Sequence, residues 1–232
     1  MPSEKQLNQL IPNGFVFYQP KDIVAGDFYW LNQKDNNLYI AACDCTGHGV
    51  PGALVSVVCN AALNRALKEF KLTKPGEILD KTRELVLTEF EKSEDEVSDG
   101  MDIALIRLNG NHLSFSGANN PLWIIRNETK EVEDIKGCKQ SIGLTNKPLP
   151  FITHEVDLKE GDCVYVFTDG YSDQFGGPKG KKFKTRAFKE LLQSVCSKPI
   201  DQQKGVVENT LKDWKGHLEQ VDDICVIGLK II

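Results

Sequence analysis

Several aspartates stand where apolar segments of the 232-residue chain turn or begin. Asp44 follows the apolar run LYIAAC, and Asp169 follows CVYVFT. Asp27 lies in the aromatic segment GDFYW, and the pair Asp222-Asp223 precedes ICVIGL. Aspartate is common in turns at strand edges, so any one of these positions is unremarkable by itself. The repeated pattern, and the position of Asp27 inside an expected strand, indicate that the carboxylates converge on one point.

Converging carboxylates repel one another, and bound cations remove that cost. A site built of carboxylate oxygens selects Mg²⁺ or Mn²⁺ over zinc. Two such ions about 3.5–4 Å apart can share a water and lower its pKa, so that a metal-bridging hydroxide can attack phosphorus. The sequence shows no convincing Ser/His/Asp or cysteine-based nucleophile. These residues therefore predict a hydrolytic centre with two Mn²⁺ or Mg²⁺ ions.

The elements that must position these aspartates follow from the apolar pattern. Strands are predicted at 14–18, 25–31, 37–43, 102–108, 112–117, 122–126, 151–157, 162–168 and 223–232. Helices are predicted at 50–70, 77–92, 183–196 and 199–217, with an exposed acidic loop, EKSEDEVSDG, at 91–100. This order lacks strict βαβ alternation and favours an α+β sandwich of antiparallel sheets with helices outside. Without repeats or a linker, residues 1–232 read as a single domain in which 1–12 form an N-terminal extension, a candidate linker from a larger protein.

Composition narrows the function classes. The net charge of -5, from 28 basic and 33 acidic residues, argues against a nucleic-acid-binding protein. No apolar run reaches the roughly 20 residues that cross a bilayer, and the polar N-terminus does not resemble a signal peptide. We therefore expect a cytoplasmic domain without membrane contact. The seven cysteines include no CxxC pair, which favours reduced, buried thiols over a zinc site.

Four segments carry a family resemblance: PKDIVAGDFYW, CDCTGHGVPGA, VFTDGYSD and QVDDICVIGL, in this order across residues 20–229. Together they resemble the SpoIIE-like branch of the metal-dependent (protein phosphatase 2C-like, PPM) serine/threonine phosphatases. The resemblance implies an αββα four-layer sandwich of two mainly antiparallel sheets flanked by helices. It places two metal ions at one edge of the sheets.

The resemblance also assigns the metal ligands, which act in catalysis through the metal-bound water. The family usually has glycine directly after its second aspartate; a backbone carbonyl can serve there whatever the side chain. The implied ligands are Asp27, Asp44, the backbone carbonyl of Cys45, Asp169, and Asp222 with Asp223 as the alternative.

Four further positions keep two interpretations each. Asp99 lies near where relatives hold a third metal, or it belongs to a solvated loop. Asp102 is an outer neighbour of the metals or a turn cap. Lys21 binds substrate phosphate as a point charge or is an exposed turn lysine. His48 is a general acid or, more in keeping with its tight GHG turn, a structural histidine.

The function implied by the resemblance is hydrolysis of phosphoserine or phosphothreonine on a partner protein, an anti-anti-sigma-type domain in bacterial signalling. Two alternatives stay open, a hydrolase of small phosphoesters and a catalytically silent signalling or binding module of the same fold. The resemblance further implies a homodimer contact through the helices between 51 and 92 and an N-terminal sensor domain. The polar loops 136–150 and 171–185, the second with a lysine cluster, are candidates for recognising the phosphorylated partner.

Overall fold

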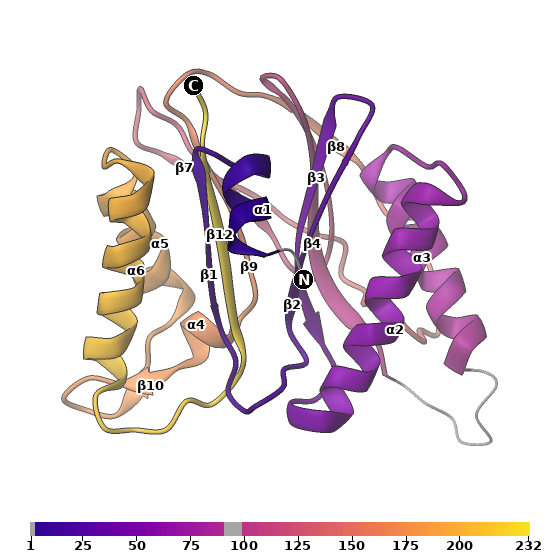
Figure 1. Ribbon diagram of the computed structural model, residues 1–232. Coiled ribbons are helices and arrows are strands. Elements are labelled where there is room, and N and C mark those ends of the chain that lie inside the picture. Colours follow the sequence, from indigo (N-terminus) through magenta and orange to yellow (C-terminus); the bar gives the residue numbers. More distant parts are fainter. Residues whose placement is uncertain (1–2, 91–98) are drawn as a thin grey trace.

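The computed structural model describes residues 3–90 and 99–232 and arranges them in four layers (Figure 1). One sheet has the order β2-β3-β4-β5-β8 and the other the order β1-β12-β9-β6-β7, with every neighbouring pair antiparallel. A pair of helices covers the outer face of each sheet. The predicted α+β sandwich of two antiparallel sheets flanked by helices is confirmed.

The strands of the first sheet are β2 (Phe28–Lys34), β3 (Asn37–Cys45), β4 (Met101–Asn109), β5 (His112–Ala118) and β8 (His154–Asp157). Those of the second are β1 (Gly14–Gln19), β12 (Ile224–Lys230), β9 (Cys163–Phe167), β6 (Leu122–Ile125) and β7 (Val132–Ile135). The helices are α1 (Glu4–Leu10), α2 (Gly49–Lys68), α3 (Pro75–Phe90), α4 (Gly170–Asp173), α5 (Thr185–Val195) and α6 (Ile200–Lys215). A short hairpin joins β10 (Phe175–Gly176) to β11 (Lys181–Lys182).

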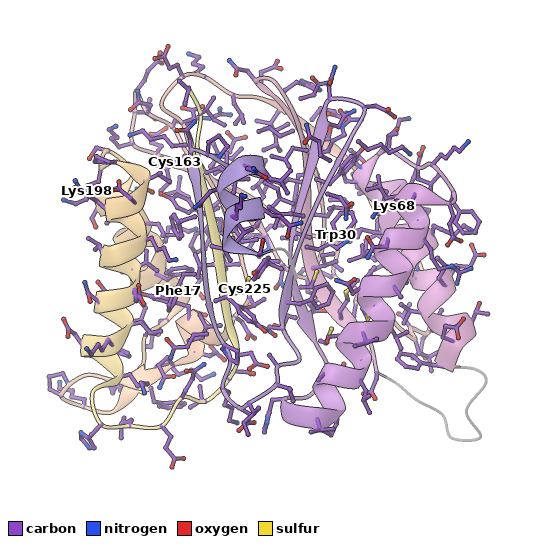
Figure 2. The ribbon with its side chains drawn as sticks, viewed as in Figure 1. Phe17, Trp30, Lys68, Cys163, Lys198 and Cys225 are labelled. Carbon is purple, nitrogen blue, oxygen red and sulfur yellow. The ribbon has the colours of Figure 1, made fainter. Side chains whose placement is uncertain are left out.

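Three hydrophobic cores hold the layers together, and Figure 2 labels residues from all three. Trp30 belongs to the core under α2 and α3, Cys225 to the core between the sheets, and Phe17 to the core under α5 and α6. Each core removes large apolar side chains from water, which is the main stabilising contribution to such a fold.

Side-chain alternation along β3 decides where its aspartate points. Tyr39, Ala41 and Cys43 pack towards the helices, whereas Ile40 and Ala42 lie between the two sheets. Because strand side chains alternate between faces, Asp44 continues the inter-sheet series at the end of the strand.

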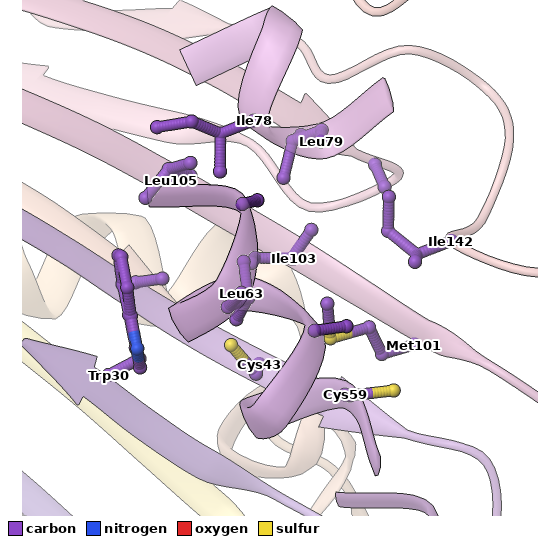
Figure 3. Packing of buried hydrophobic residues seen from close by; sticks show 14 of the residues in the cluster. Trp30, Cys43, Cys59, Leu63, Ile78, Leu79, Met101, Ile103, Leu105 and Ile142 are labelled. Carbon is purple, nitrogen blue, oxygen red and sulfur yellow. The ribbon is translucent and has the colours of Figure 1, made fainter. Parts of the chain in front are cut away.

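Helix α2 is long and apolar enough to cross a membrane, although a core helix passes the same test. Its residues Cys59 and Leu63 are fully buried, and Figure 3 shows Leu63 near Ile103 of the first sheet. We therefore interpret α2 as a packing helix of the sandwich.

The structure corrects several element boundaries. The strand predicted at 25–31 begins only at Phe28, so placing Asp27 inside a strand was wrong. The backbone amides of Lys21 and Gly26 bond to the Asp223 carboxylate, and this segment therefore does not join the β2 ladder. The strand predicted at 151–157 is confined to β8.

Five short elements were not predicted: α1, α4, β7, β10 and β11. Helix α1 lies in the expected N-terminal extension and starts with a capping box between Ser3 and Gln6; Leu7 and Leu10 pack on the inter-sheet core. Strand β7 and the β10–β11 hairpin are short and polar, so the apolar pattern did not reveal them. Most of the predicted acidic loop, residues 91–98, lies outside the described residues. All seven cysteines are free, as predicted.

Candidate metal centre

The predicted aspartates gather at one edge of the sandwich, where strands of both sheets end. Asp44 is the penultimate residue of β3 and lies directly opposite Asp102 in the antiparallel register with β4. Asp169 follows β9 and Asp223 precedes β12, and the Thr168 amide bonds to the Cys225 carbonyl between them. Asp27 lies just before β2, whose first residue Phe28 is paired with Cys43. Strand register therefore brings together residues that are up to about 200 positions apart in the sequence.

Asp27 is buried at this edge, with 4% of its surface exposed. The Thr168 hydroxyl is hydrogen-bonded to it, but its Oδ2 atom has no partner within the described part of the chain. Burial, followed by the charge of Asp44, raises the pKa of Asp27. A buried carboxylate without a compensating partner is costly, so this atom calls for a cation or a proton.

The electrostatic coupling extends across the whole edge. Burial, followed by the charges of Asp169 and Asp222, raises the pKa of Asp44. Burial, followed by the charges of Asp173 and Asp222, raises the pKa of Asp169 to about 6. A hydrogen bond with Asp27 acts in the opposite sense on Asp44, but the net pKa of Asp44 is still raised. Raised pKa values among neighbouring carboxyl groups are the pattern expected of carboxylates that share a cation site.

A polar cavity of about 290 Å³ opens beside these groups. Asp44, Asp102 and Asp169 line it, together with Thr46 and Ser141. Asp27 instead borders a second, larger hollow of about 690 Å³ between the 20–28 segment and α2. The carboxylates thus separate two solvent-filled spaces.

The two aspartates of the DD pair have different surroundings. Asp223 is 1% exposed, and its carboxylate accepts hydrogen bonds from the amides of Lys21 at 2.7 Å and Gly26 at 2.8 Å. Asp222 is half-buried, and its Oδ1 atom accepts only the Asp223 amide, at 2.9 Å, in the described residues. Within the described residues Asp222 therefore accepts fewer hydrogen bonds than Asp223, and Asp223 holds the loop before Asp27.

The backbone around Cys45 is closely packed. A side chain at Gly26 would collide with the Gly47 carbonyl and would come within 3.2 Å of the Cys45 carbonyl oxygen. Gly47 adopts a φ of 83°, which favours glycine. The Cys45 side chain packs into the helix-covered core, away from Asp44. Glycine is therefore required at positions 26 and 47, which lie close to the Cys45 carbonyl that the resemblance assigns to a metal.

The other predicted positions differ in their relation to the cavity. The Oδ1 atom of Asp102 accepts hydrogen bonds from Ser141 at 2.6 Å and Asn119 at 2.9 Å, so it lines the cavity as a fixed group. Asp99 is not among the cavity-lining residues, and only its backbone approaches Gly143.

Lys21 and His48 meet at the mouth of the site. The Lys21 Nζ atom lies 3.1 Å from His48 Nε2, and His48 Nδ1 lies 3.1 Å from Asp22 Oδ2. If Nδ1 donates to Asp22, Nε2 is free to accept from the lysine ammonium. His48 thereby bridges the loop before Asp27 and the loop after Asp44.

The donor set suits Mg²⁺ or Mn²⁺. Among residues 3–90 and 99–232, no three His, Cys, Asp or Glu side chains form a group that could hold a metal ion by themselves. Mg²⁺ usually keeps several waters and needs only one or two carboxylates from the protein. The unpartnered Oδ2 of Asp27 and the neighbouring carboxyl groups fit that requirement.

Sequence reasoning missed four polar groups at this edge: Thr168, Ser141, Asn119 and Asp22. Thr168 and Asp22 adjoin predicted site residues, so proximity in sequence could have suggested them. Ser141 and Asn119 reach Asp102 from separate loops, and no local pattern marks them.

Comparisons with known proteins agree with this geometry. The family described as Stage II sporulation protein E (SpoIIE) matches residues 34–232. No curated protein sequence matches the chain.

Solved structures give the same fold. The SiaA-PP2C domain of Pseudomonas aeruginosa superposes with a TM-score of 0.88 at 29% identity, covering 99% of this chain and 90% of that one. The SpoIIE phosphatase domain with a regulatory fragment from Bacillus subtilis has a TM-score of 0.75 at 18% identity, covering 94% of this chain and 61% of that one. The RsbU and RsbW domains of a Mycobacterium tuberculosis protein have a TM-score of 0.72 at 19% identity, covering 95% and 60%.

The family match covers most of the chain, and the four-layer sandwich agrees with the solved PP2C-type domains. This chain belongs to the SpoIIE family and has a PP2C-like phosphatase fold.

Proposed function

We propose that this chain is a metal-dependent phosphatase that hydrolyses phosphoserine or phosphothreonine on a partner protein. The observation that carries the proposal is the buried, unpartnered Oδ2 of Asp27 beside Asp44, whose charge raises the pKa of Asp27. Uncompensated carboxyl groups of this kind are costly unless they serve a cation. A structure of RsbX, another protein with this fold, contains magnesium.

Each residue has a role in the proposal. Two Mn²⁺ or Mg²⁺ ions, when bound, would lower the pKa of a shared water and neutralise charge on the phosphoryl oxygens. Asp27, Asp44, Asp169, Asp222 and the Cys45 carbonyl would hold them. Asp223 keeps the Lys21–Asp27 loop in place through the amides of Lys21 and Gly26.

Lys21 is the proposed phosphate contact. Its ammonium is held by His48 at the mouth of the site, and a positive charge there offsets the repulsion between a phosphate dianion and the surrounding carboxylates. Asp99, which does not line the cavity, is proposed only as a ligand of a third ion.

The protein substrate is proposed from the family, with an anti-anti-sigma-type domain as the expected class. The two alternative functions can be distinguished from this proposal by comparing metal binding with hydrolysis of nucleotides and of a phosphoserine protein. A small-phosphoester hydrolase would prefer nucleotides to a phosphoserine protein, and a silent module would bind metal without turnover.

The test is hydrolysis of para-nitrophenyl phosphate and of a phosphoserine peptide with EDTA, Mg²⁺ or Mn²⁺. We expect activity only with a divalent ion and its loss in Asp169→Asn. Asp201→Asn, an exposed aspartate in the first turn of α6, is the matched control and should keep wild-type activity. Metal-independent hydrolysis, or an active Asp169→Asn, would contradict the proposal.

A homodimer through α2 is part of the same proposal. Val50, Leu54 and Val57 are each about two-thirds exposed on the outer face of α2, and the fully exposed Ile23 lies on the adjoining loop. Such a patch is characteristic of an interaction surface. Sedimentation should show a dimer that Leu54→Glu dissociates, and a monomeric wild type would refute this contact. A cytoplasmic location, expected from the sequence composition, and an N-terminal sensor domain, implied by the resemblance, are further proposals.

A further inference from the structure

A run of positive charge adjoins the acidic edge. Residues 174–189 contain five lysines and one arginine and no Asp or Glu, in a chain whose net charge is -5. Three of these cations have partners, because Lys182 pairs with Asp173, Arg186 with Glu190 and Lys189 with Asp134. The remaining lysines are Lys179, Lys181 and Lys184, which we call the basic triplet.

The basic triplet is exposed, and its ammonium groups have no polar partner in the described part of the chain. All three side chains are solvent-exposed, and none has an ion pair or side-chain hydrogen bond within the described residues. Lysine with a free ammonium group is a flexible point charge that can reach an approaching anion.

The backbone that carries these lysines is firmly anchored. The Phe183 amide bonds to the Gln174 carbonyl at 2.9 Å, and the Gly177 amide bonds to the Trp214 carbonyl at 2.7 Å. Phe183 packs edge-on against Trp214, with ring centroids 5.2 Å apart. The charges therefore stand on a fixed support beside the site.

That support is tied to a proposed ligand. Helix α4 begins directly after Asp169 and ends at Asp173, whose carboxylate lies 2.6 Å from Lys182 Nζ. Figure 1 shows α4 and β10 at the lower edge of the sandwich, near the loops that enter β2 and β12. The Lys182–Asp173 contact therefore joins the hairpin that carries the basic triplet to the helix that follows Asp169.

The backbone conformation of Lys184 is a second observation that points to a role for its side chain. It adopts a φ of 76° and a ψ of 146°, a region that costs energy for any residue except glycine. Its amide bonds to the Ser172 carbonyl at 2.7 Å, which holds the strained conformation. A lysine kept where glycine would fit without strain indicates that its side chain has a use.

We propose that the basic triplet binds an acidic surface next to the phosphorylated residue of the substrate protein. The inference rests on the proposed phosphatase function and specifies the class of its substrate, a phosphoprotein with Asp or Glu around the target serine or threonine. Three free cations suit a local acidic patch, whereas nucleic acids and anionic membranes are bound by larger basic clusters.

The experiment compares two phosphoserine peptides that differ only in their flanks, three aspartates on each side in one and three asparagines in the other. For the wild type with Mn²⁺ we expect kcat/KM to be about tenfold higher on the acidic peptide at about 50 mM salt, with the difference shrinking at about 500 mM. The variant Lys179→Gln/Lys181→Gln/Lys184→Gln should lose this preference while hydrolysing para-nitrophenyl phosphate at the wild-type rate.

A matched control removes the same charge at the opposite end of the sandwich. Lys68, Lys71 and Lys198 are exposed, and Figure 2 shows Lys68 and Lys198 at the upper end. Their triple substitution by glutamine should leave the preference intact. Lys184→Gly should lower the preference without lowering the melting temperature, because it relieves the strained φ.

The outcomes separate this inference from the proposed function. Absence of metal-dependent para-nitrophenyl phosphate hydrolysis would overturn the phosphatase function itself. Peptide affinity, measured by fluorescence anisotropy, still reports the acidic preference in that case. Equal kcat/KM and affinity for both peptides, equal loss in both triple variants, or triplet-dependent binding to phosphatidylserine vesicles but not to the acidic peptide would overturn the inference.

Discussion

Strand β9 is flanked by two aspartates, the buried Asp162 and the more exposed Asp169, and the two have opposite surroundings. Asp162, just before the strand, accepts hydrogen bonds from Arg126 Nη1 at 2.8 Å, the Asn127 amide at 2.8 Å and the Lys159 amide at 3.0 Å. Burial acts to raise the pKa of Asp162, but these donors outweigh it and the pKa is lowered. Asp169, just after the strand, lies among Asp44, Asp173 and Asp222, and its pKa is raised.

Burial of an aspartate is therefore not enough to mark a functional site. At the Asp162 end the protein supplies all the compensation that the carboxylate needs, so the group is structural. At the Asp169 end the neighbours are other carboxylates, and Asp27 keeps an unpartnered oxygen within the described chain. The missing compensation is what predicts a cation there.

The largest effect should come from Asp44→Asn. Removing a proposed metal ligand should lower metal-dependent phosphatase activity at least about 100-fold. Asp162→Asn should retain kcat per folded molecule, which steady-state kinetics normalised to folded protein would measure. A comparable loss of activity in the two variants would contradict the assignment of a metal site to one end of β9 and a structural aspartate to the other.

Stability should respond in the reverse order. Asp162→Asn leaves the partly buried Arg126 with a weaker partner and should lower the free energy of unfolding by about 2–3 kcal/mol. Asp44→Asn removes a repelling charge and should not destabilise the metal-free protein. Urea denaturation in EDTA measures both, and a larger loss for Asp44→Asn would argue that its carboxylate is structural.

The two ends should also have opposite pH dependence. Because the pKa of Asp169 is raised to about 6, the metal-free native state holds the proton more tightly than the unfolded chain. Stability from this group is therefore lost as pH rises from about 4 to about 7. The lowered pKa of Asp162 acts in the other sense, since its contribution is present above the ordinary aspartate pKa and is lost as pH falls below it.

Melting temperatures in EDTA between about pH 3 and pH 8 would separate these contributions. Asp169→Asn should flatten the decline towards neutral pH, and Asp162→Asn should flatten the decline in acid. Unchanged profiles in both variants would contradict the assigned pKa directions.

The smallest effect should come from the mouth of the site. Lys21→Ala should raise KM for a phosphoserine peptide about threefold to tenfold and leave metal affinity nearly unchanged, because Lys21 is proposed to meet the phosphate alone. Lys5→Ala, a change of the same charge on α1, is the control. A Lys21→Ala variant with wild-type KM would show that Lys21 does not contact the substrate phosphate.

How far the sequence could predict this arrangement depends on the range of each interaction. Strand alternation through Ile40, Ala42 and Asp44 is local, so the fold class and the convergence of carboxylates were predictable. The different hydrogen bonding of Asp222 and Asp223 was not predictable, because it depends on the Lys21 and Gly26 amides at the other end of the chain. The contrast between Asp162 and Asp169 was also hidden, because Arg126 reaches Asp162 from a separate strand end.

The most direct test is isothermal titration of metal-free protein with Mn²⁺, comparing wild type, Asp44→Asn and Asp162→Asn. If the carboxylates at the Asp44 edge form a metal centre, we expect Mn²⁺ to bind the wild type and Asp162→Asn, and to bind Asp44→Asn much more weakly. An Asp44→Asn variant that binds Mn²⁺ like the wild type would contradict the claim that the uncompensated carboxylates at this edge form a metal centre.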